Sequence, residues 1–213
     1  MGEQRMIFNR GGPLGRQEIR VISTAAGCRR IVNRLYQDCQ DCNVLGFDCE
    51  WETYQGHRQP VSVLQLASPH GFCAVIRLSK INNLPWELQS LLMDRSIFKV
   101  GVATSADASK LLQDYGLEVR GCCDLRFLAE RIGLTQRSLA GLAEETLSII
   151  MVKDWRVSSS HWDAAYLSEE QIRYAADDAY IGALVFEEIF RYLGHHDANR
   201  MTVWLDKPYP HHN

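Results

Sequence analysis

The sequence predicts an α/β fold in which a mixed sheet is flanked by helices, and three observations carry that prediction. Three short apolar runs, residues 44–49, 62–67 and 71–76, follow one another with short connections, as antiparallel strands do. Strand-like and helix-like runs then alternate over residues 86–147. A capping pattern opens a long helical segment over residues 168–193. Antiparallel strands followed by strand–helix units indicate one mixed sheet.

The first three strands are expected to form an antiparallel meander. Residues 44–49 form a buried run that ends in acidic side chains, and residues 62–67 alternate between polar and apolar side chains. Gly56, Pro60 and Gly71 lie in the connections, where they favour turns. Two further strands, expected at residues 97–102 and 122–124, complete a sheet of five.

The helices are predicted from apolar periodicity and from their end signals. Apolar residues recur at helical spacing over residues 24–38, with Thr24 as the expected N-cap. Ser168 and Gln171 form a capping-box pattern at the start of the last helix. The other helices are expected at residues 86–93, 106–115, 126–132 and 139–147.

Length and composition bound the class of protein. The 213 residues fit one α/β domain, expected over residues 21–193, with an N-terminal extension (1–20) and a C-terminal tail or start of a following domain (194–213). The net charge is −3, which argues against a protein that coats nucleic acid through bulk charge. An enzyme that binds one strand end is compatible with that charge. No run of 18 apolar residues occurs, so no membrane contact is predicted.

The seven cysteines are an odd number, and several lie in apolar runs. This usage predicts buried free thiols in a reducing, intracellular compartment. Cys39 and Cys42 form a lone C-x-x-C without a second ligand pair, so two helix-end cysteines are favoured over a zinc site. His211 and His212 also lack companion ligands, and a disordered end is favoured there.

Two acidic residues close the strand at residues 44–49. Asp48 and Glu50 are i and i+2, so their side chains share one face of the strand. Two carboxylates on one face repel unless a cation joins them. Asp107 opens a later helix, where capping and the helix dipole alone also favour an acid.

The last helix carries a tyrosine and an aspartate on one face. Tyr174 and Asp178 are i and i+4. Asp177 lies about 100° round the helix from Asp178, so only Asp178 shares a face with Tyr174. Asp178 is therefore the predicted site residue, and Asp177 is expected to be solvated or to contact and support the site residues. A Tyr hydroxyl at this spacing can position a water molecule beside the carboxylate.

A cluster of Asp and Glu on rigid elements suits one kind of chemistry. Cleavage of a phosphodiester needs a nucleophilic water and neutralisation of charge on the phosphate, and two divalent ions roughly 3.5–4 Å apart supply both. Mg²⁺ and Mn²⁺ prefer oxygen ligands. Each acidic motif is weak alone, so the order of the motifs carries the argument.

Three motifs occur in order. They are Gly46-Phe-Asp-Cys-Glu-Trp51, then Lys99-Val-Gly-Val102 followed by Asp107 and Lys110-Leu-Leu112, then Tyr174-Ala-Ala-Asp-Asp-Ala179. Together they resemble the DEDD family of 3′→5′ exonucleases, in its tyrosine branch (DEDDy), to which RNase D and the Werner exonuclease domain belong. The resemblance covers residues 21–193.

The resemblance implies an RNase H-like fold and two divalent ions, Mg²⁺ or Mn²⁺. It implies that Asp48, Glu50 and Asp178 hold one ion. Asp48 also reaches the second ion, which Asp107 holds directly or through water. Tyr174 orients the attacking water. The implied reaction is hydrolysis of single-stranded or 3′-ended DNA or RNA from the 3′ end to nucleoside 5′-monophosphates.

The same resemblance suggests substrate-binding residues. Trp51, Leu64 and Gln65 match positions that line the terminal-nucleotide pocket of relatives, where an aromatic ring can stack on a base. For Trp51, packing at the rim of the core is the alternative. Lys153 matches a lysine near the scissile phosphate, and Lys110 is a further candidate. Both lysines could equally be solvated surface groups.

One position departs from the family pattern. The family often has a second Gly where Ala103 stands. The added methyl group is expected to shift the loop that leads to Asp107, and with it the approach of the substrate.

Other functions stay open from sequence alone. An inactive exonuclease fold that binds nucleic acid or protein is one alternative, and an endonuclease on the same fold is another. The presence of all four acids and the tyrosine favours the exonuclease. The sequence decides neither DNA against RNA nor Mg²⁺ against Mn²⁺. It leaves open a homodimer, which the resemblance implies, and a location in nucleus, mitochondrion or cytoplasm.

Overall fold

The structure is a computed structural model that describes residues 3–10, 12–40, 42–193 and 205–210. Its strands in chain order are β1 (Glu3–Asn9), β2 (Arg16–Ile22), β3 (Val44–Tyr54), β4 (His57–Ser68), β5 (Phe72–Ile76), β6 (Phe98–Gly101) and β7 (Cys122–Asp124). They form one sheet in the order β1-β2-β5-β4-β3-β6-β7. Pairs β3–β4 and β4–β5 are antiparallel, whereas β3–β6 and β6–β7 are parallel. The mixed α/β fold with an antiparallel meander is confirmed.

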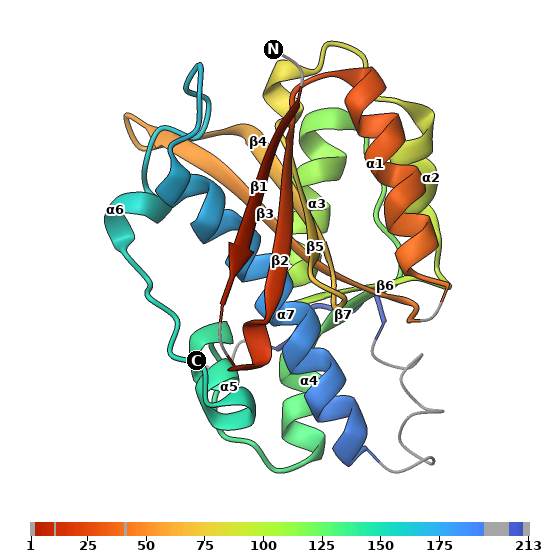
Figure 1. Ribbon diagram of the computed structural model, residues 1–213, viewed down its shortest axis with the longest axis vertical. Coiled ribbons are helices and arrows are strands. Elements are labelled where there is room, and N and C mark those ends of the chain that lie inside the picture. The colour runs from red at the N-terminus through yellow and green to blue at the C-terminus, as the bar shows by residue number, and fades with distance from the viewer. Residues whose placement is uncertain (1–2, 11, 41, 194–204, 211–213) are drawn as a thin grey trace.

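The helices lie on both sides of this sheet (Figure 1). The α-helices are α1 (Ala25–Asp38), α2 (Trp86–Met93), α3 (Thr104–Tyr115), α4 (Leu125–Arg131), α5 (Leu139–Leu147), α6 (Trp155–Ser158) and α7 (Glu169–Tyr192), and two 3₁₀ turns are η1 (Gly12–Leu14) and η2 (Leu78–Lys80). The Thr24 side chain accepts a hydrogen bond from Gly27 N at 3.1 Å, as its predicted N-cap role requires. The capping box of Ser168 and Gln171 is also confirmed. Helix α6 was not predicted, because four residues are too few to show a period.

The prediction of five strands was wrong, since β1 and β2 add a hairpin to the sheet. They pair with each other antiparallel, and β2 pairs parallel to β5. The expected N-terminal extension therefore belongs largely to the sheet. The sequence did not predict these strands because charged side chains interrupt their apolar pattern. Charged side chains of this kind are typical of a protected sheet edge. Arg20, for example, bonds Glu3 and Glu18 at 2.8 Å each.

The described part of the C-terminal tail packs against β7 and α4. Asp206 N donates to the Cys122 carbonyl at 2.8 Å, and Cys122 N donates to Asp206 Oδ1 at 2.9 Å. The Tyr209 ring is buried edge-on against Phe127, with ring centroids 5.1 Å apart. Residues 205–210 therefore cover the edge of β7. The expectation for His211 and His212 lies outside the described residues.

Helix α7 approaches the sheet most closely at β3. A Cβ atom built on Gly46 would lie 1.7 Å from the Ala179 carbonyl oxygen, so only glycine lets the helix backbone rest on the strand. Apolar side chains of α7 form one core with the sheet, and α1, α2 and α3 cover the other face around a second core. This contact fixes the position of α7 over the first half of β3.

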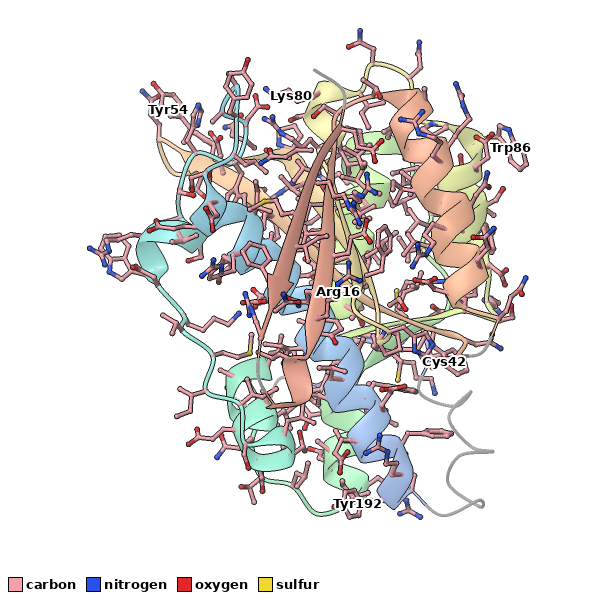
Figure 2. All side chains as sticks on the ribbon, in the orientation of Figure 1. Arg16, Cys42, Tyr54, Lys80, Trp86 and Tyr192 are labelled. Carbon is pink, nitrogen blue, oxygen red and sulfur yellow. The ribbon has the colours of Figure 1, made fainter. Side chains whose placement is uncertain are left out.

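The cysteines are free thiols, as the sequence predicted, and the exposed apolar side chains are scattered. All seven cysteines are free thiols, and six of them are buried. Within the described ranges no helix is both long and apolar enough to cross a bilayer. Large exposed apolar side chains such as Tyr54, Trp86 and Tyr192 lie far apart on the molecule (Figure 2). Isolated residues of this kind are ordinary on a protein surface.

Ala103 adopts the left-handed conformation, with φ 61° and ψ 28°, immediately before α3. This conformation explains why glycine suits the position, since a Cβ group there meets the following carbonyl oxygen. Ala103 N donates to Asp124 Oδ2 at 2.9 Å, and Asp124 is buried and ion-paired with Arg126. The turn that leads to Asp107 is therefore strained but firmly held.

Ala103→Gly is expected to raise the free energy of unfolding by up to about 1 kcal/mol. Relief of the steric cost outweighs the added freedom of the unfolded chain. Ala103→Val should lower it by roughly 1–3 kcal/mol, because a β-branched residue tolerates this conformation least. Urea unfolding of the three proteins measures both changes. Equal stability of the alanine and valine proteins would contradict the strain.

Candidate active site

Three carboxylates from two elements meet near the middle of β3, which continues past Glu50 to Tyr54 and does not end at these acids as the sequence suggested. Asp48 and Glu50 share the face of β3 that α7 covers, and Asp178 reaches them from α7. One oxygen atom from each lies within 4.8 Å of the other two. Glu50 and Asp178 are buried, and Asp48 is partly exposed. The structure therefore brings together three of the four predicted acids.

Asp107 lies beside this trio rather than within it. It is buried in the first turn of α3 and accepts a hydrogen bond from Lys110 Nζ at 3.1 Å. Its charge nevertheless acts on the trio, since it helps to raise the pKa values of Asp48 and Glu50. The fourth acid is thus close enough to share the electrostatic field of the site.

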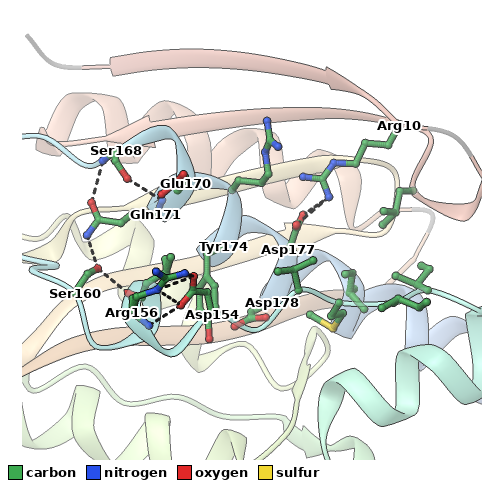
Figure 3. Close-up of a pocket in the computed structure, with 18 of the residues that line it drawn as sticks. Arg10, Asp154, Arg156, Ser160, Ser168, Glu170, Gln171, Tyr174, Asp177 and Asp178 are labelled. Carbon is green, nitrogen blue, oxygen red and sulfur yellow. Dashed lines mark hydrogen bonds and ion pairs between the residues drawn. The ribbon is translucent and has the colours of Figure 1, made fainter.

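The two adjacent aspartates of α7 have separate partners. Asp177 faces Arg10 of the N-terminal hairpin, whose Nη1 donates to both carboxylate oxygens at 2.8 and 2.9 Å (Figure 3). Asp178 faces Asp48 and Glu50 and contacts Lys153 Nζ. The structure therefore places Asp178 in the cluster and gives Asp177 a supporting position, as the helical spacing predicted.

The carboxylates raise one another's pKa values. Burial, followed by repulsion from Asp178, raises the pKa of Glu50 to about 9. Burial also raises the pKa of Asp48 well above its usual range, with contributions from Asp178, Asp107 and Glu50. The pKa of Asp107 is raised to about 6 by burial, against the effect of Lys110. Folding thus assembles negative charge that a cation would stabilise.

The donor set fits a hard divalent ion. All the convergent ligand atoms are carboxylate oxygens, which Mg²⁺ and Mn²⁺ prefer. Lys153 contacts Asp178 and Lys110 contacts Asp107, but two positive charges do not balance four neighbouring carboxylates. The same residues that repel one another without metal could therefore hold it.

Glu50→Gln is expected to stabilise the metal-free protein at pH 8. The pKa of Glu50 is raised from 4.5 to about 9, so between these values the folded protein binds more protons than the unfolded chain. Its free energy of unfolding therefore falls as the pH rises from 4.5 to about 9. Removing the charge of Glu50 should therefore raise the free energy of unfolding by roughly 1–3 kcal/mol at pH 8 and change it little near pH 4.5.

Urea unfolding in EDTA measures this change. Glu188→Gln, which alters an acid of α7 that pairs with Arg191 away from the cluster, is the matched control and should not stabilise the protein. Added Mn²⁺ should make the wild type the more stable of the two proteins, because the wild type keeps the Glu50 carboxylate as a metal ligand. A Glu50→Gln protein no more stable than wild type at pH 8 would contradict the predicted repulsion.

Tyr174 and Lys153 complete the site. The Tyr174 ring packs on the buried Trp162, with ring centroids 6.2 Å apart, and Lys153 Nζ lies 4.9 Å from the Tyr174 ring centroid. Burial, followed by the charges of Asp178, Glu50 and Asp48, raises the Tyr174 pKa. The tyrosine hydroxyl therefore stays protonated at neutral pH and can donate a hydrogen bond.

The predicted substrate-binding residues divide between the site and the core. Trp51 and Lys110 lie together beside Asp107, with Lys110 Nζ 4.1 Å from the Trp51 ring centroid. Gln65 pairs directly with Asp48 across β3 and β4, and its buried amide has no hydrogen-bond partner among the described residues. Leu64, by contrast, is fully buried in the core between the sheet and α1–α3. The structure does not bring Leu64 to the site.

Two pockets meet at the carboxylates. The smaller, about 480 Å³, is lined by Asp48, Lys153, Tyr174 and Asp178 together with residues 138–140. The larger, about 1000 Å³, shares Tyr174 and Asp178 (Figure 3). Sequence reasoning missed Arg10, residues 138–140 and most of the larger pocket, because no motif marks these positions.

A mixed α/β sheet with convergent carboxylates, a tyrosine and adjoining pockets defines a metal-binding nuclease. Residues 19–193 match the family model described as 3′-5′ exonuclease, and the chain belongs to this family. The resemblance to 3′→5′ exonucleases found in the sequence motifs is therefore confirmed at the level of the family.

The relatives agree with this assignment. Exonuclease 3'-5' domain-containing protein 2 of Drosophila melanogaster is 39% identical over 88% of this chain and 32% of its own length. The Homo sapiens protein of the same name is 44% identical over 80% of this chain and 29% of its own length. The helicase WRN of Mus musculus, a bifunctional 3'-5' exonuclease, is 31% identical over 78% of this chain and 12% of its own length. The chain thus spans about a third or less of these relatives.

Solved structures show the same fold. The crystal structure of the EXD2 exonuclease domain is 41% identical to this chain, with a TM-score of 0.53, and covers 87% of this chain and 93% of its own. The same domain soaked in Mn and GMP is 39% identical, with a TM-score of 0.51, over 91% of this chain and 99% of its own. These matches cover nearly all of the fold described above.

Proposed function

We propose that this exonuclease hydrolyses DNA, RNA or both from the 3′ end, with two divalent ions, and releases nucleoside 5′-monophosphates. The observation that carries the proposal is the convergence of Asp48, Glu50 and Asp178 within 4.8 Å, with Asp107 beside them. Carboxylates placed in this way match the ligands that Mg²⁺ and Mn²⁺ require. The EXD2 exonuclease domain has been crystallised and soaked in Mn and in Mg, which supports the choice of metal.

In this proposal the acids would share two ions. Asp48, Glu50 and Asp178 would hold one ion, and the other would be held by Asp48 and, directly or through water, by Asp107. Bound divalent ions supply a water of lowered pKa and neutralise charge on the phosphate. Tyr174 orients the attacking water through its protonated hydroxyl group.

Cationic and aromatic groups on either side of the acids would bind the nucleotide. Lys153 offsets the charge of Asp178 and offers an ammonium group to the scissile phosphate. Trp51, beneath Lys110, presents a ring on which the terminal base can stack. The EXD2 domain was soaked with GMP and also with dGMP, so its structures favour neither sugar.

A time course on matched, 5′-labelled DNA and RNA strands tests the proposal. With Mg²⁺ or Mn²⁺ we expect a ladder that shortens one nucleotide at a time from the 3′ end, and EDTA should abolish it. A strand with a blocked 3′ end should resist cleavage, whereas internal cuts would indicate an endonuclease. Binding without cleavage under every metal condition would instead support an inactive binding module.

Two further expectations stay predictions. A homodimer is implied by the sequence resemblance, and sedimentation equilibrium of the purified protein would reveal it. An intracellular, reducing location is expected from the seven free thiols, and imaging of the tagged full-length protein would test it.

A further inference from the structure

The larger pocket lies between three parts of the chain that the catalytic motifs do not connect. Arg10 and Leu14 from the N-terminal hairpin form one wall, and residues 149–157 form another. Helix α7 lies between them with Tyr174 and Asp178, which also line the smaller pocket. The larger pocket is therefore an extension of the catalytic site.

The lining suits an anionic chain that carries flat, apolar rings. Leu14, Ile149, Met151 and Ile181 give apolar surface. Arg10, Arg156 and Arg173 add three guanidinium groups to the lining. Two of the acids in the pocket already bond to arginines, Asp177 to Arg10 and Asp154 to Arg156. The lining also contains the acids Glu170 and Asp178. Tyr174 offers an aromatic ring of the kind on which a base of a single strand can stack.

Arg10 has an unused donor in this setting. Nη1 donates both bonds to Asp177, whereas Nη2 is shielded from water and has no hydrogen-bond partner among the described residues. A buried donor without a partner carries a free-energy cost. A small rotation of the side chain that exposes Nη2 to the pocket would let a ligand oxygen remove that cost. Asp177 and the Phe8 ring, whose centroid is 5.7 Å from Arg10 Cζ, hold the guanidinium group in place.

We propose that the larger pocket binds the nucleotides upstream of the 3′ end, and that Arg10 donates to a phosphodiester oxygen of that strand. The inference rests on the proposed exonuclease function. The volume of the larger pocket, about 1000 Å³, is at the upper end for ligand pockets. The pocket therefore has room for more than one nucleotide. A planar guanidinium group is well matched to phosphate oxygens.

Arg10 fits this role better than the other two arginines. The side chain of Arg156 is 74% exposed and forms an ion pair with Asp154. Arg173 forms an ion pair with Glu169. Arg10 is only 20% exposed, and its guanidinium group points toward Asp177 on α7 (Figure 3). It also precedes residues 19–193, which match the family model, so the contact is contributed by a segment outside that match.

Binding without metal tests the proposal directly. Fluorescence anisotropy would compare a labelled 10-nucleotide DNA strand with a labelled dinucleotide in EDTA. Arg10→Ala should weaken binding of the 10-mer about tenfold and reduce its salt dependence by about 0.7, the slope of one phosphate contact to a single strand. Binding of the dinucleotide should stay unchanged. Arg10→Lys keeps the positive charge but lacks the planar, forked N–H donors of the guanidinium group. It should recover part of the affinity for the 10-mer.

Arg5→Ala is the matched control, because Arg5 lies on the same hairpin, is 48% exposed and pairs with Glu18. It removes the same charge and should leave the affinity for the 10-mer unchanged. Equal affinity of wild type and Arg10→Ala for the 10-mer would overturn the proposal. So would an equal loss in Arg5→Ala, which would indicate bulk charge, or a wild type that does not bind the 10-mer.

Kinetics separate strand binding from positioning of α7. The p-nitrophenyl ester of thymidine 5′-monophosphate has no upstream nucleotide, so Arg10→Ala should lower kcat/KM for the 10-mer about tenfold more than kcat/KM for the ester. An equal fall for both substrates would show that Arg10 instead positions α7 through Asp177, and would overturn the proposal. A wild type that binds the 10-mer but cleaves nothing would refute the proposed exonuclease function alone.

Discussion

Asp48→Asn is expected to lower the rate of 3′→5′ cleavage by at least about 10²- to 10³-fold, because a carboxylate that holds divalent charge accounts for several kcal/mol of transition-state stabilisation. Asp48 is the acid whose pKa is raised by all three of the other carboxylates. Asp178, Asp107 and Glu50 all act on its charge, and it is the member of the trio most open to solvent. The amide keeps the shape of the side chain but loses the charge.

Single-turnover cleavage of a labelled strand in Mn²⁺ measures the loss, and urea unfolding confirms that the variant is folded. Glu188→Gln is the control, since it removes an acid of α7 that pairs with Arg191 away from the site. The control should cleave at the wild-type rate. A rate for Asp48→Asn within a few-fold of the control would show that the cluster is not the catalytic centre.

The sequence predicted those parts of the molecule where periodicity and end signals agree. Asp48 and Glu50 share a face because a strand repeats every two residues, and Tyr174 and Asp178 do so because a helix returns after four. Ser168 and Thr24 cap their helices with the side-chain bonds that their residue types favour. In each case the deciding interaction is local in sequence.

The parts that sequence could not predict depend on contacts between distant segments. Arg10 meets Asp177 across 167 positions, and nothing in the surrounding residues marks that pair. The burial of Leu64 has a simpler origin. Gln65 faces Asp48, so its neighbour Leu64 points to the opposite face of the sheet. The family pattern named both residues, and the strand geometry places them on opposite faces.

Gly46→Ala is expected to lower the free energy of unfolding by about 3 kcal/mol or more, a large effect for one methyl group. The added Cβ would lie 1.7 Å from the Ala179 carbonyl oxygen, where it meets backbone on both sides. No side-chain rotation relieves that overlap, so α7 and β3 have to separate. For a domain of this size the loss corresponds to a fall in Tm of roughly 6–12 °C.

The same displacement should also lower activity, because Gly46 and Ala179 each lie one or two residues from the carboxylates Asp48 and Asp178. A shift of about 1 Å between catalytic groups can cost about 10²-fold in rate. Gly182→Ala is the matched control on the same helix. Its Cβ would lie 3.5 Å from the Val100 carbonyl oxygen, an ordinary contact, and alanine favours the helix interior by up to about 1 kcal/mol.

Thermal unfolding and cleavage rates of the two variants test this geometry together. We expect Gly182→Ala to match or exceed wild-type stability and to keep its activity, whereas Gly46→Ala loses both. If the two variants behave alike, the close contact of α7 with β3 does not set the distance between the carboxylates. If Gly46→Ala loses stability but keeps its activity below its Tm, the site tolerates movement of α7, and the metal ligands are less dependent on this contact than the structure indicates.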